Sequence, residues 1–262
     1  MTDGVPDTLY IPLEAKIYST EVFPEYFVDM ASLKFKYDIP QSIIDDSSEY
    51  TTLASVARYY NTDRMERDFV RRNGKSSIVH LGVGLETANF RLSSLNTHFY
   101  SMDLPEIIEL RRRMLQEQKN ETLIPGDLFD MKWAESIPDD YPVMIVVLGV
   151  FQYFREEKIL EAIGKMKKRF PGAELVFDAT NTKGLNYTNR YVRKTGNQSA
   201  AIYFGVDDAK DFADRSRTEL LECIPFFTDA RKKLWRKAHL ITRISMAWAD
   251  RFGSAKILRL KL

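Results

Sequence analysis

The central part of the chain contains five short strand candidates, several of them continuous apolar runs, which alternate with segments predicted to be helical. Continuous apolar runs suit strands that are buried on both faces, as in parallel sheets. Strands that alternate with helices predict an α/β fold, in which helices cover both faces of a mostly parallel sheet. The five candidates cover residues 77–81, 97–102, 121–124, 142–148 and 173–178.

The segment before this region is predicted to be helical, and the segment after it to contain an insertion, helices and a terminal strand. Residues 1–75 predict a helical N-terminal cap, and residues 76–262 form the predicted core. The polar stretch 180–199 is expected to be an insertion or lid over the site. We expect a helix over 231–248 and a terminal edge strand over 255–262. The helix places five apolar residues at a spacing that predicts burial: Leu234, Ala238, Ile241, Ile244 and Trp248.

Composition and charge narrow the class of protein. The apolar content of 44% is sufficient for a large core in a chain of 262 residues. The 38 basic and 37 acidic residues give a net charge of +1, which predicts neither nucleic acid nor a membrane as a partner. The single cysteine, Cys223, excludes an intramolecular disulfide and suits a reducing compartment. Since no secretory signal or apolar run of about 20 residues is visible, we expect a cytoplasmic protein.

A glycine turn follows the first apolar run. Gly82 and Gly84 flank Val83, and glycines let the backbone approach a ligand closely. Asp103 ends the second run, 19 residues after Gly84, where a carboxylate can accept hydrogen bonds from ribose hydroxyls. Asp127 follows the third run, where it could accept a hydrogen bond from an adenine amine. This arrangement predicts a ligand that contains adenosine.

The residue three positions after Gly84 distinguishes between two kinds of cofactor. A dinucleotide fingerprint has a third glycine three residues after the second, but this chain has Thr87 there. The substitution disfavours a pyrophosphate ligand such as a nicotinamide dinucleotide. S-adenosyl-L-methionine has ribose, adenine and an amino-acid end but no phosphate, so it suits the pattern better. No metal is expected.

Four segments of the chain match a known family: ARYYNTDRMERDFV (57–70), IVHLGVGLETANFRL (78–92), MDLPEIIELRR (102–112) and PGAELVFD (171–178). Through them the chain resembles the leucine carboxyl methyltransferase family, which includes O-methyltransferases of polyketide synthesis. The resemblance implies a class I methyltransferase with a Rossmann-like, seven-stranded, mostly parallel sheet and a helical N-terminal cap. Its cofactor would be S-adenosyl-L-methionine and its product S-adenosyl-L-homocysteine.

The resemblance also assigns residues to the cofactor, several of which spacing alone would not select. By spacing, Arg58 and the arginines at 111–113 are predicted to be solvated surface side chains. Leu148 stands where the family commonly has an acidic residue that lines the cofactor site. The implied set is Arg58 and Lys16 at the cofactor carboxylate, Gly82 and Gly84 in the turn, Asp103 at the ribose, and Asp127 with Leu128 beside the adenine.

The methyl acceptor is less well defined than the cofactor. We expect transfer to a carboxylate or hydroxyl oxygen of a small molecule, such as a polyketide-like metabolite. A carboxylate is already ionised and needs no general base, whereas a phenol would benefit from one. Two alternatives stay open: a cofactor-binding protein with little catalysis, which Leu148 suggests, and a nicotinamide-dependent oxidoreductase. The candidate residues of the acceptor pocket are His80, Tyr153, Asp178 and Tyr187.

Overall fold

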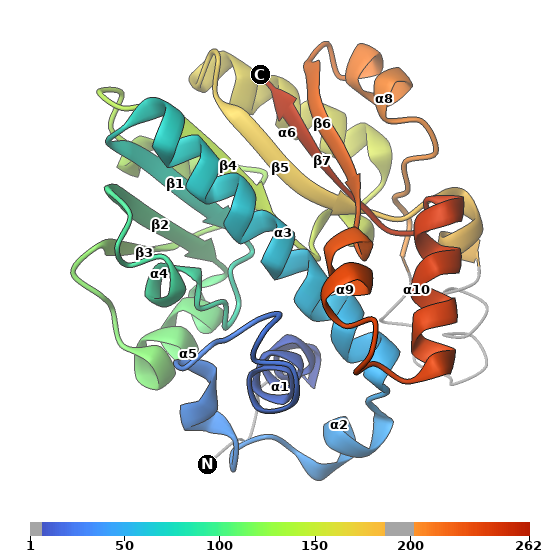
Figure 1. Ribbon diagram of the computed structural model, residues 1–262. Helices are drawn as coiled ribbons and strands as arrows, with labels where there is room; N and C mark the ends of the chain where they lie inside the picture. The colour runs from blue at the N-terminus through green and yellow to red at the C-terminus, as the bar shows by residue number, and fades with distance from the viewer. Residues whose placement is uncertain (1–6, 187–201) are drawn as a thin grey trace.

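A computed structural model describes residues 7–186 and 202–262 and shows a seven-stranded sheet with helices on both faces (Figure 1). The strand order is β3-β2-β1-β4-β5-β7-β6. This architecture confirms the predicted fold class, and each of the five strand candidates forms a strand. The strands are β1 (Ser76–Leu81), β2 (Thr97–Asp103), β3 (Glu121–Pro125), β4 (Val143–Val147), β5 (Glu174–Ala179), β6 (Glu219–Pro225) and β7 (Lys256–Lys261).

The first five strands are parallel, whereas β7 pairs antiparallel with both β5 and β6. The prediction of a terminal edge strand is therefore wrong, because β7 lies between two strands and β6 forms the edge. Only Lys261 of β7 is exposed. The Lys256 Nζ donates to the Val206 carbonyl at 2.8 Å, and the Arg259 Nε lies 2.6 Å from a Glu174 carboxylate oxygen. Partners from neighbouring elements thus allow two basic side chains to be buried.

Three helices make up most of the N-terminal region: α1 (Asp7–Val22), α2 (Gln41–Asp46) and α3 (Glu49–Asn73). Helix α3 begins at a capping box, in which the Ser48 and Thr51 side chains bond to each other's backbone amides. Its buried apolar side chains pack against the sheet, in one apolar cluster with residues of β1, β2 and β4. These helices lie in the region of the predicted cap, and α3 also covers one face of the sheet.

The two faces of the sheet are covered by different helices. Helices α6 (Glu156–Arg169) and α8 (Ala209–Arg215) pack in one apolar cluster with the strands, beside the buried Trp133. Helices α3, α9 (Thr228–Lys233) and α10 (Leu240–Phe252) contribute to the cluster on the opposite face. The short α4 (Ala88–Arg91) follows the glycine turn, and α5 (Pro105–Leu115) packs on β2 and β3.

The helix predicted over 231–248 is two helices, α9 (Thr228–Lys233) and α10 (Leu240–Phe252). The turn between them resets the helical register, so that Thr242, Met246 and Ala249 point inward. The predicted burial is correct for the residues of the turn, Leu234 and Ala238, but wrong for three residues of α10. Ile241, Ile244 and Trp248 are 79%, 60% and 59% exposed.

Candidate functional site

A cavity of about 560 Å³ lies at the carboxyl ends of β1, β2 and β4, beside α3. Open parallel sheets bind ligands at this edge, where the strand order changes direction. The cavity joins the glycine turn to residues from α1, α3 and the loops after β3 and β4. Most residues assigned to the cofactor line it: Arg58, Gly82, Gly84, Asp103, Asp127, Leu128 and Leu148.

The glycine turn has a backbone that other residues would adopt only with strain. Gly82 and Gly84 have φ angles of +70° and +49°, in the left-handed region. A Cβ atom on Gly82 would lie 2.3 Å from the Cγ2 of Val150. The turn is held to β2, because the Gly82 amide donates to the Met102 carbonyl at 2.9 Å. Both backbone conformation and space therefore require glycine at position 82.

Asp103 lies at the end of β2, directly beside the turn. One carboxylate oxygen accepts a hydrogen bond from the Gly84 amide at 2.7 Å, and the other accepts from the Leu104 amide at 2.8 Å. Burial raises the pKa of Asp103, although the two amides act in the opposite direction. A carboxylate has about four acceptor positions, so lone pairs are left for ribose hydroxyls.

The loop after β3 forms the adenine end of the predicted site. Asp127 is exposed, and its carboxylate accepts a hydrogen bond from the Phe129 amide at 2.9 Å. Leu128 is buried at 6% exposure, and its carbonyl accepts from the Trp133 indole at 3.1 Å. Both side chains line the cavity, together with Phe129. An apolar wall beside an exposed carboxylate suits adenine, which is flat and carries an amine.

Arg58 is the cationic group at the other end of the cavity. Its Nη2 lies 3.1 Å from a carboxylate oxygen of Asp178, whose other oxygen accepts from the Gly149 amide at 2.6 Å. Burial disfavours the charged guanidinium, but Asp178, Tyr59 and Tyr153 together outweigh burial and raise the pKa of Arg58. Within the described chain, its buried Nε has no hydrogen-bond partner. The guanidinium as a whole lines the cavity, with 20% of the side chain exposed, so it can bind a ligand carboxylate.

Lys16 lies beneath the turn and not among the residues that line the cavity. Its Nζ donates to the Leu85 carbonyl, a Glu86 carboxylate oxygen and the Thr87 hydroxyl at 3.2, 3.0 and 3.2 Å. The side chain is fully buried. All three ammonium protons therefore have acceptors that belong to the turn, and binding of the cofactor carboxylate by Lys16 stays a prediction.

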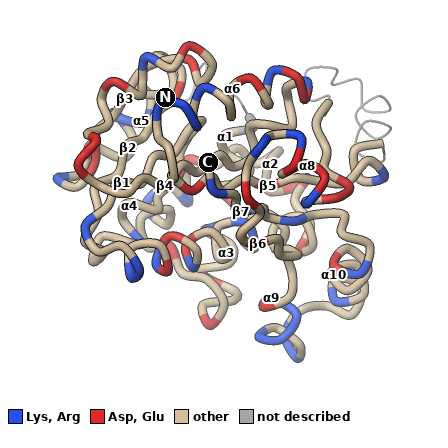
Figure 2. The backbone as a smooth tube through the Cα atoms, turned by 90° about the horizontal axis from the view of Figure 1, so that it is seen from above, with Lys and Arg blue, Asp and Glu red and all other residues tan. Residues whose placement is uncertain are grey.

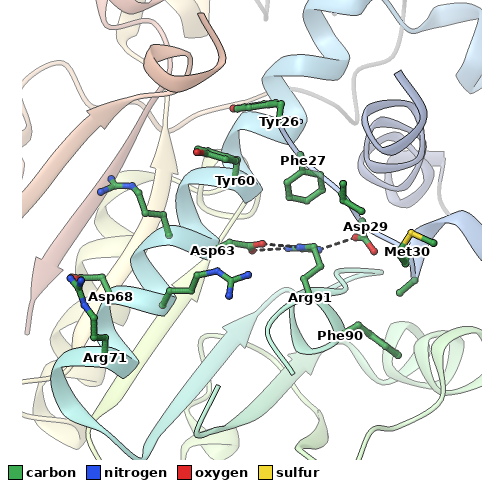
Figure 3. Close-up of a pocket in the computed structure, with 14 residues that line it drawn as sticks. Tyr26, Phe27, Asp29, Met30, Tyr60, Asp63, Asp68, Arg71, Phe90 and Arg91 are labelled. Carbon is green, nitrogen blue, oxygen red and sulfur yellow. Dashed lines mark hydrogen bonds and ion pairs between the residues drawn. The ribbon is translucent and has the colours of Figure 1, made fainter. Parts of the chain in front are cut away.

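Arg91 is a site residue that the sequence did not point to. Its guanidinium pairs with Asp29 at 2.9 Å, Asp63 at 2.8 Å and Glu86 at 2.6 Å. Figure 3 shows Arg91 between Asp63 of α3 and Asp29 of the N-terminal region, at the wall of a second groove of about 810 Å³. Asp63, Glu86 and Arg91 also line the first cavity. The network therefore ties three separate segments to the turn.

Arg111 is a second residue of this kind, and its predicted exposure is wrong. It is 2% exposed, because its guanidinium pairs with the buried carboxylate of Glu121 at 2.7 Å. It also donates to the Gly84 carbonyl at 3.3 Å and to the Glu86 carbonyl. Neither Arg91 nor Arg111 has a spacing that marks it in the sequence, since their acidic partners come from other elements.

The four acceptor-pocket candidates have different positions. His80 and Tyr153 line the cavity. His80 is buried, with its Nε2 2.9 Å from a Glu66 carboxylate oxygen, and burial raises the pKa of Glu66. Asp178 does not line the cavity but holds Arg58. Tyr187, like most of the predicted insertion at 180–199, lies outside the described residues.

The arrangement suits S-adenosyl-L-methionine. The cavity has a carboxylate at the ribose position, an apolar wall at the adenine position, and the Arg58 guanidinium for the amino-acid carboxylate. Thr87 is fully buried beneath the turn and bonds to Asp29, so it packs where a dinucleotide fingerprint has its third glycine. Among the described residues, no cluster of three or more His, Cys, Asp or Glu side chains could hold a metal ion.

Comparison with known proteins gives a family match over residues 20–167, to the family described as leucine carboxyl methyltransferase. The chain is 26% identical over 164 residues to the tetracenomycin polyketide synthesis O-methyltransferase TcmP of Streptomyces glaucescens, with 59% of each chain covered. It is 25% identical over 221 residues to the S-adenosyl-L-methionine-dependent methyltransferase dpfgK of Gibberella zeae, with 74% of each covered. The alignment thus spans under two thirds of TcmP.

Solved structures show the same fold at low sequence identity. A DUF574 family protein from Streptomyces avermitilis has a TM-score of 0.59 at 11% identity, with 95% of this chain and 96% of that chain covered. Magnesium protoporphyrin IX methyltransferase from Synechocystis, solved with bound S-adenosylhomocysteine, has a TM-score of 0.50 at 13% identity, with 82% and 88% covered. No helix in residues 7–186 and 202–262 is long and apolar enough to cross a membrane.

Proposed function

Because the chain belongs to the leucine carboxyl methyltransferase family, we propose that it transfers a methyl group from S-adenosyl-L-methionine to a carboxylate or hydroxyl oxygen of a small molecule. The observation that carries this proposal is that one cavity is lined by the glycine turn, Asp103, Asp127 and Arg58. TcmP is described as an O-methyltransferase of polyketide synthesis, which supports oxygen as the acceptor atom and a polyketide-like metabolite as the acceptor.

The residues of the cavity would act mainly by positioning. When bound, the cofactor supplies an activated methyl group. Arg58 would bind its carboxylate and Asp103 its ribose, so that the cofactor is held at both ends. Orientation of two reactants in one cavity can supply a large part of a rate enhancement. A carboxylate acceptor requires no proton transfer, so the proposal does not depend on His80 or Tyr153 acting as a base.

The direct test is release of S-adenosylhomocysteine from S-adenosyl-L-methionine in the presence of a panel of carboxylic acids and a panel of phenols. We expect turnover with members of at least one panel and none without an acceptor. The Asp103→Ala variant is the matched control for background hydrolysis. Absence of turnover with every acceptor, despite tight cofactor binding, would reject the methyltransferase proposal.

That outcome would favour the second candidate, a cofactor-binding protein with little catalysis. The observation behind it is Leu148, which lines the cavity where the family commonly has an acidic residue. Loss of a carboxylate beside a cationic ligand removes a favourable charge interaction. A Leu148→Glu variant that binds S-adenosyl-L-methionine more tightly and gains turnover would support this candidate.

A further inference from the structure

The outward face of α10, together with the turn before it, is unusually apolar. Ile241, Ile244 and Trp248 are 79%, 60% and 59% exposed. At 3.6 residues per turn they lie on one side of the helix, opposite the buried Thr242 and Met246. Three more exposed residues extend this surface, which we call the α10 face: Trp235 (60%), Leu240 (63%) and Phe252 (49%). Contiguous exposed apolar patches mark interaction sites.

Basic side chains surround the α10 face. Residues 231–251 contain seven Lys and Arg residues and one acidic residue, Asp250. Arg231 pairs with Asp250 at 3.3 Å, and the Arg243 guanidinium stacks on the Trp235 ring at 4.0 Å. Figure 2 shows basic segments over α9 and along α10, at the same edge of the molecule. In the described part of the chain, no ion-pair partner faces Lys232, Arg236 or Arg251.

This charge distribution determines which partner fits. A second copy related by two-fold symmetry would bring the same basic side chains together, which is repulsive. The chain segment 187–201 contains Arg190, Arg193 and Lys194 and no acidic residue, so it does not complement the α10 face in charge. The complementary partner is anionic and has an apolar layer that can accept isoleucine and tryptophan side chains.

We propose that the α10 face binds an anionic lipid surface, with α10 lying in the plane of the interface. Amphipathic helices of this type bury their apolar face at the boundary between headgroups and acyl chains. Trp235 and Trp248 suit the headgroup level, where indole rings are enriched. Lys232, Arg236 and Arg251 would contact lipid phosphates, and each basic residue near an anionic surface strengthens binding.

The test is sedimentation of the full chain with phosphatidylcholine vesicles that contain or lack phosphatidylglycerol. We expect binding only to the anionic vesicles, with loss at high salt. The variants Ile244→Ser/Trp248→Ser and Lys232→Glu/Arg236→Glu should each lower the partition coefficient at least about tenfold. The matched controls are Met30→Ser and Lys132→Glu, which change an exposed apolar and an exposed basic side chain elsewhere and should leave binding unchanged.

Circular dichroism melting checks that each variant is folded. If Ile244→Ser/Trp248→Ser does not fold, Ile241→Ser replaces it, because Ile241 is the most exposed residue of the α10 face. No binding to anionic vesicles, or binding that the variants do not change, would overturn the proposal. A dimer in light scattering that Ile244→Ser/Trp248→Ser disrupts, without vesicle binding, would assign the α10 face to a second copy instead.

Discussion

At the scale of single residues, Arg58 shows how an isolated side chain becomes a site. Its position on α3 would suit a solvated surface arginine, and only the fold brings Asp178 of β5 to within 3.1 Å of it. Asp178 in turn accepts from the Gly149 amide. The guanidinium is therefore held at the carboxyl ends of β4 and β5 while its Nε has no hydrogen-bond partner among the described residues. Because this cation lines the cavity, it is suited to a ligand carboxylate.

Replacement of Arg58 should weaken binding of the carboxylate end of the cofactor alone. We expect Arg58→Met to lower the affinity for S-adenosylhomocysteine by about 1.5–3 kcal/mol, the usual contribution of a charged hydrogen bond. Affinity for methylthioadenosine, which lacks the amino-acid end, should stay unchanged. Calorimetry with both ligands measures the difference, and Arg64→Met on the same helix is the control. Equal losses for both ligands would show that Arg58 acts only through folding.

Asp103 carries the prediction for the ribose. Asp103→Ala should weaken S-adenosylhomocysteine binding by about 1–3 kcal/mol, because two ribose hydroxyls and two backbone amides lose their acceptor. Methylthioadenosine should lose the same amount, since it retains the ribose. Asp130→Ala, which changes an exposed carboxylate in the loop after β3, is the control. An unchanged calorimetric affinity would remove Asp103 from the site.

At the scale of elements, the turn after β1 depends on its neighbours for its shape. Gly82→Ala should destabilise the protein by about 2–4 kcal/mol, because it adds left-handed backbone strain and a clash with Val150. Gly164→Ala in α6 is the control, and its expected effect on stability has the opposite sign. A Cβ there meets nothing within 4 Å, so we expect stabilisation of about 0.8–1 kcal/mol from helix propensity. Urea unfolding of both variants tests this contrast, and equal effects would contradict it.

The Arg91 network predicts a pH dependence of stability. Burial opposes ionisation of Asp29 and Glu86, but Arg91 and Lys16 outweigh it and hold the pKa of both carboxyls below their usual values of 3.8 and 4.5. A lowered pKa in the folded state stabilises the protein above the unfolded pKa. This contribution is lost as the pH falls through the lowered folded pKa.

Arg91→Met should therefore destabilise the protein by about 3–5 kcal/mol at neutral pH, since it leaves Asp29 and Asp63 without their cation and Glu86 with Lys16 alone. The difference from the wild type should narrow between about pH 5 and pH 3, as protonation removes the charges. Denaturant unfolding across this range measures it. A difference that is constant with pH would show that Arg91 contributes through packing and not through charge.

At the scale of the whole molecule, the cofactor cavity joins α1, α3 and the connections that follow five strands of the sheet. Ligand binding should therefore stabilise the complete fold. S-adenosylhomocysteine at about 100 times its Kd should add about 2.7 kcal/mol and raise Tm by roughly 5 °C or more. NAD at the same concentration should leave Tm unchanged. Stabilisation by NAD but not by S-adenosylhomocysteine would contradict the assignment of the cofactor.

The net charge of the molecule conceals a local cluster of basic residues. The net charge of +1 predicts no anionic surface as a partner, yet seven of the basic residues lie between 231 and 251. Helical spacing across this region predicted one helix with Ile241, Ile244 and Trp248 buried. The break before α10 rotates these side chains outward, and no local pattern marks that rotation. Our proposal for the α10 face depends on this difference between spacing and structure.

The sequence by itself determined the five parallel strands, the glycine turn, and the carboxylate that follows β2. These features depend on local hydrophobic patterns and on a fixed spacing between residues, so residues that are close in the sequence suffice to define them. Only the tertiary structure decided which charged groups are buried, as for Lys16, Arg91 and Arg111. It also decided that β7 lies inside the sheet and that α10 turns its apolar face outward. Burial depends on which neighbour meets a side chain, and those neighbours are distant in the sequence.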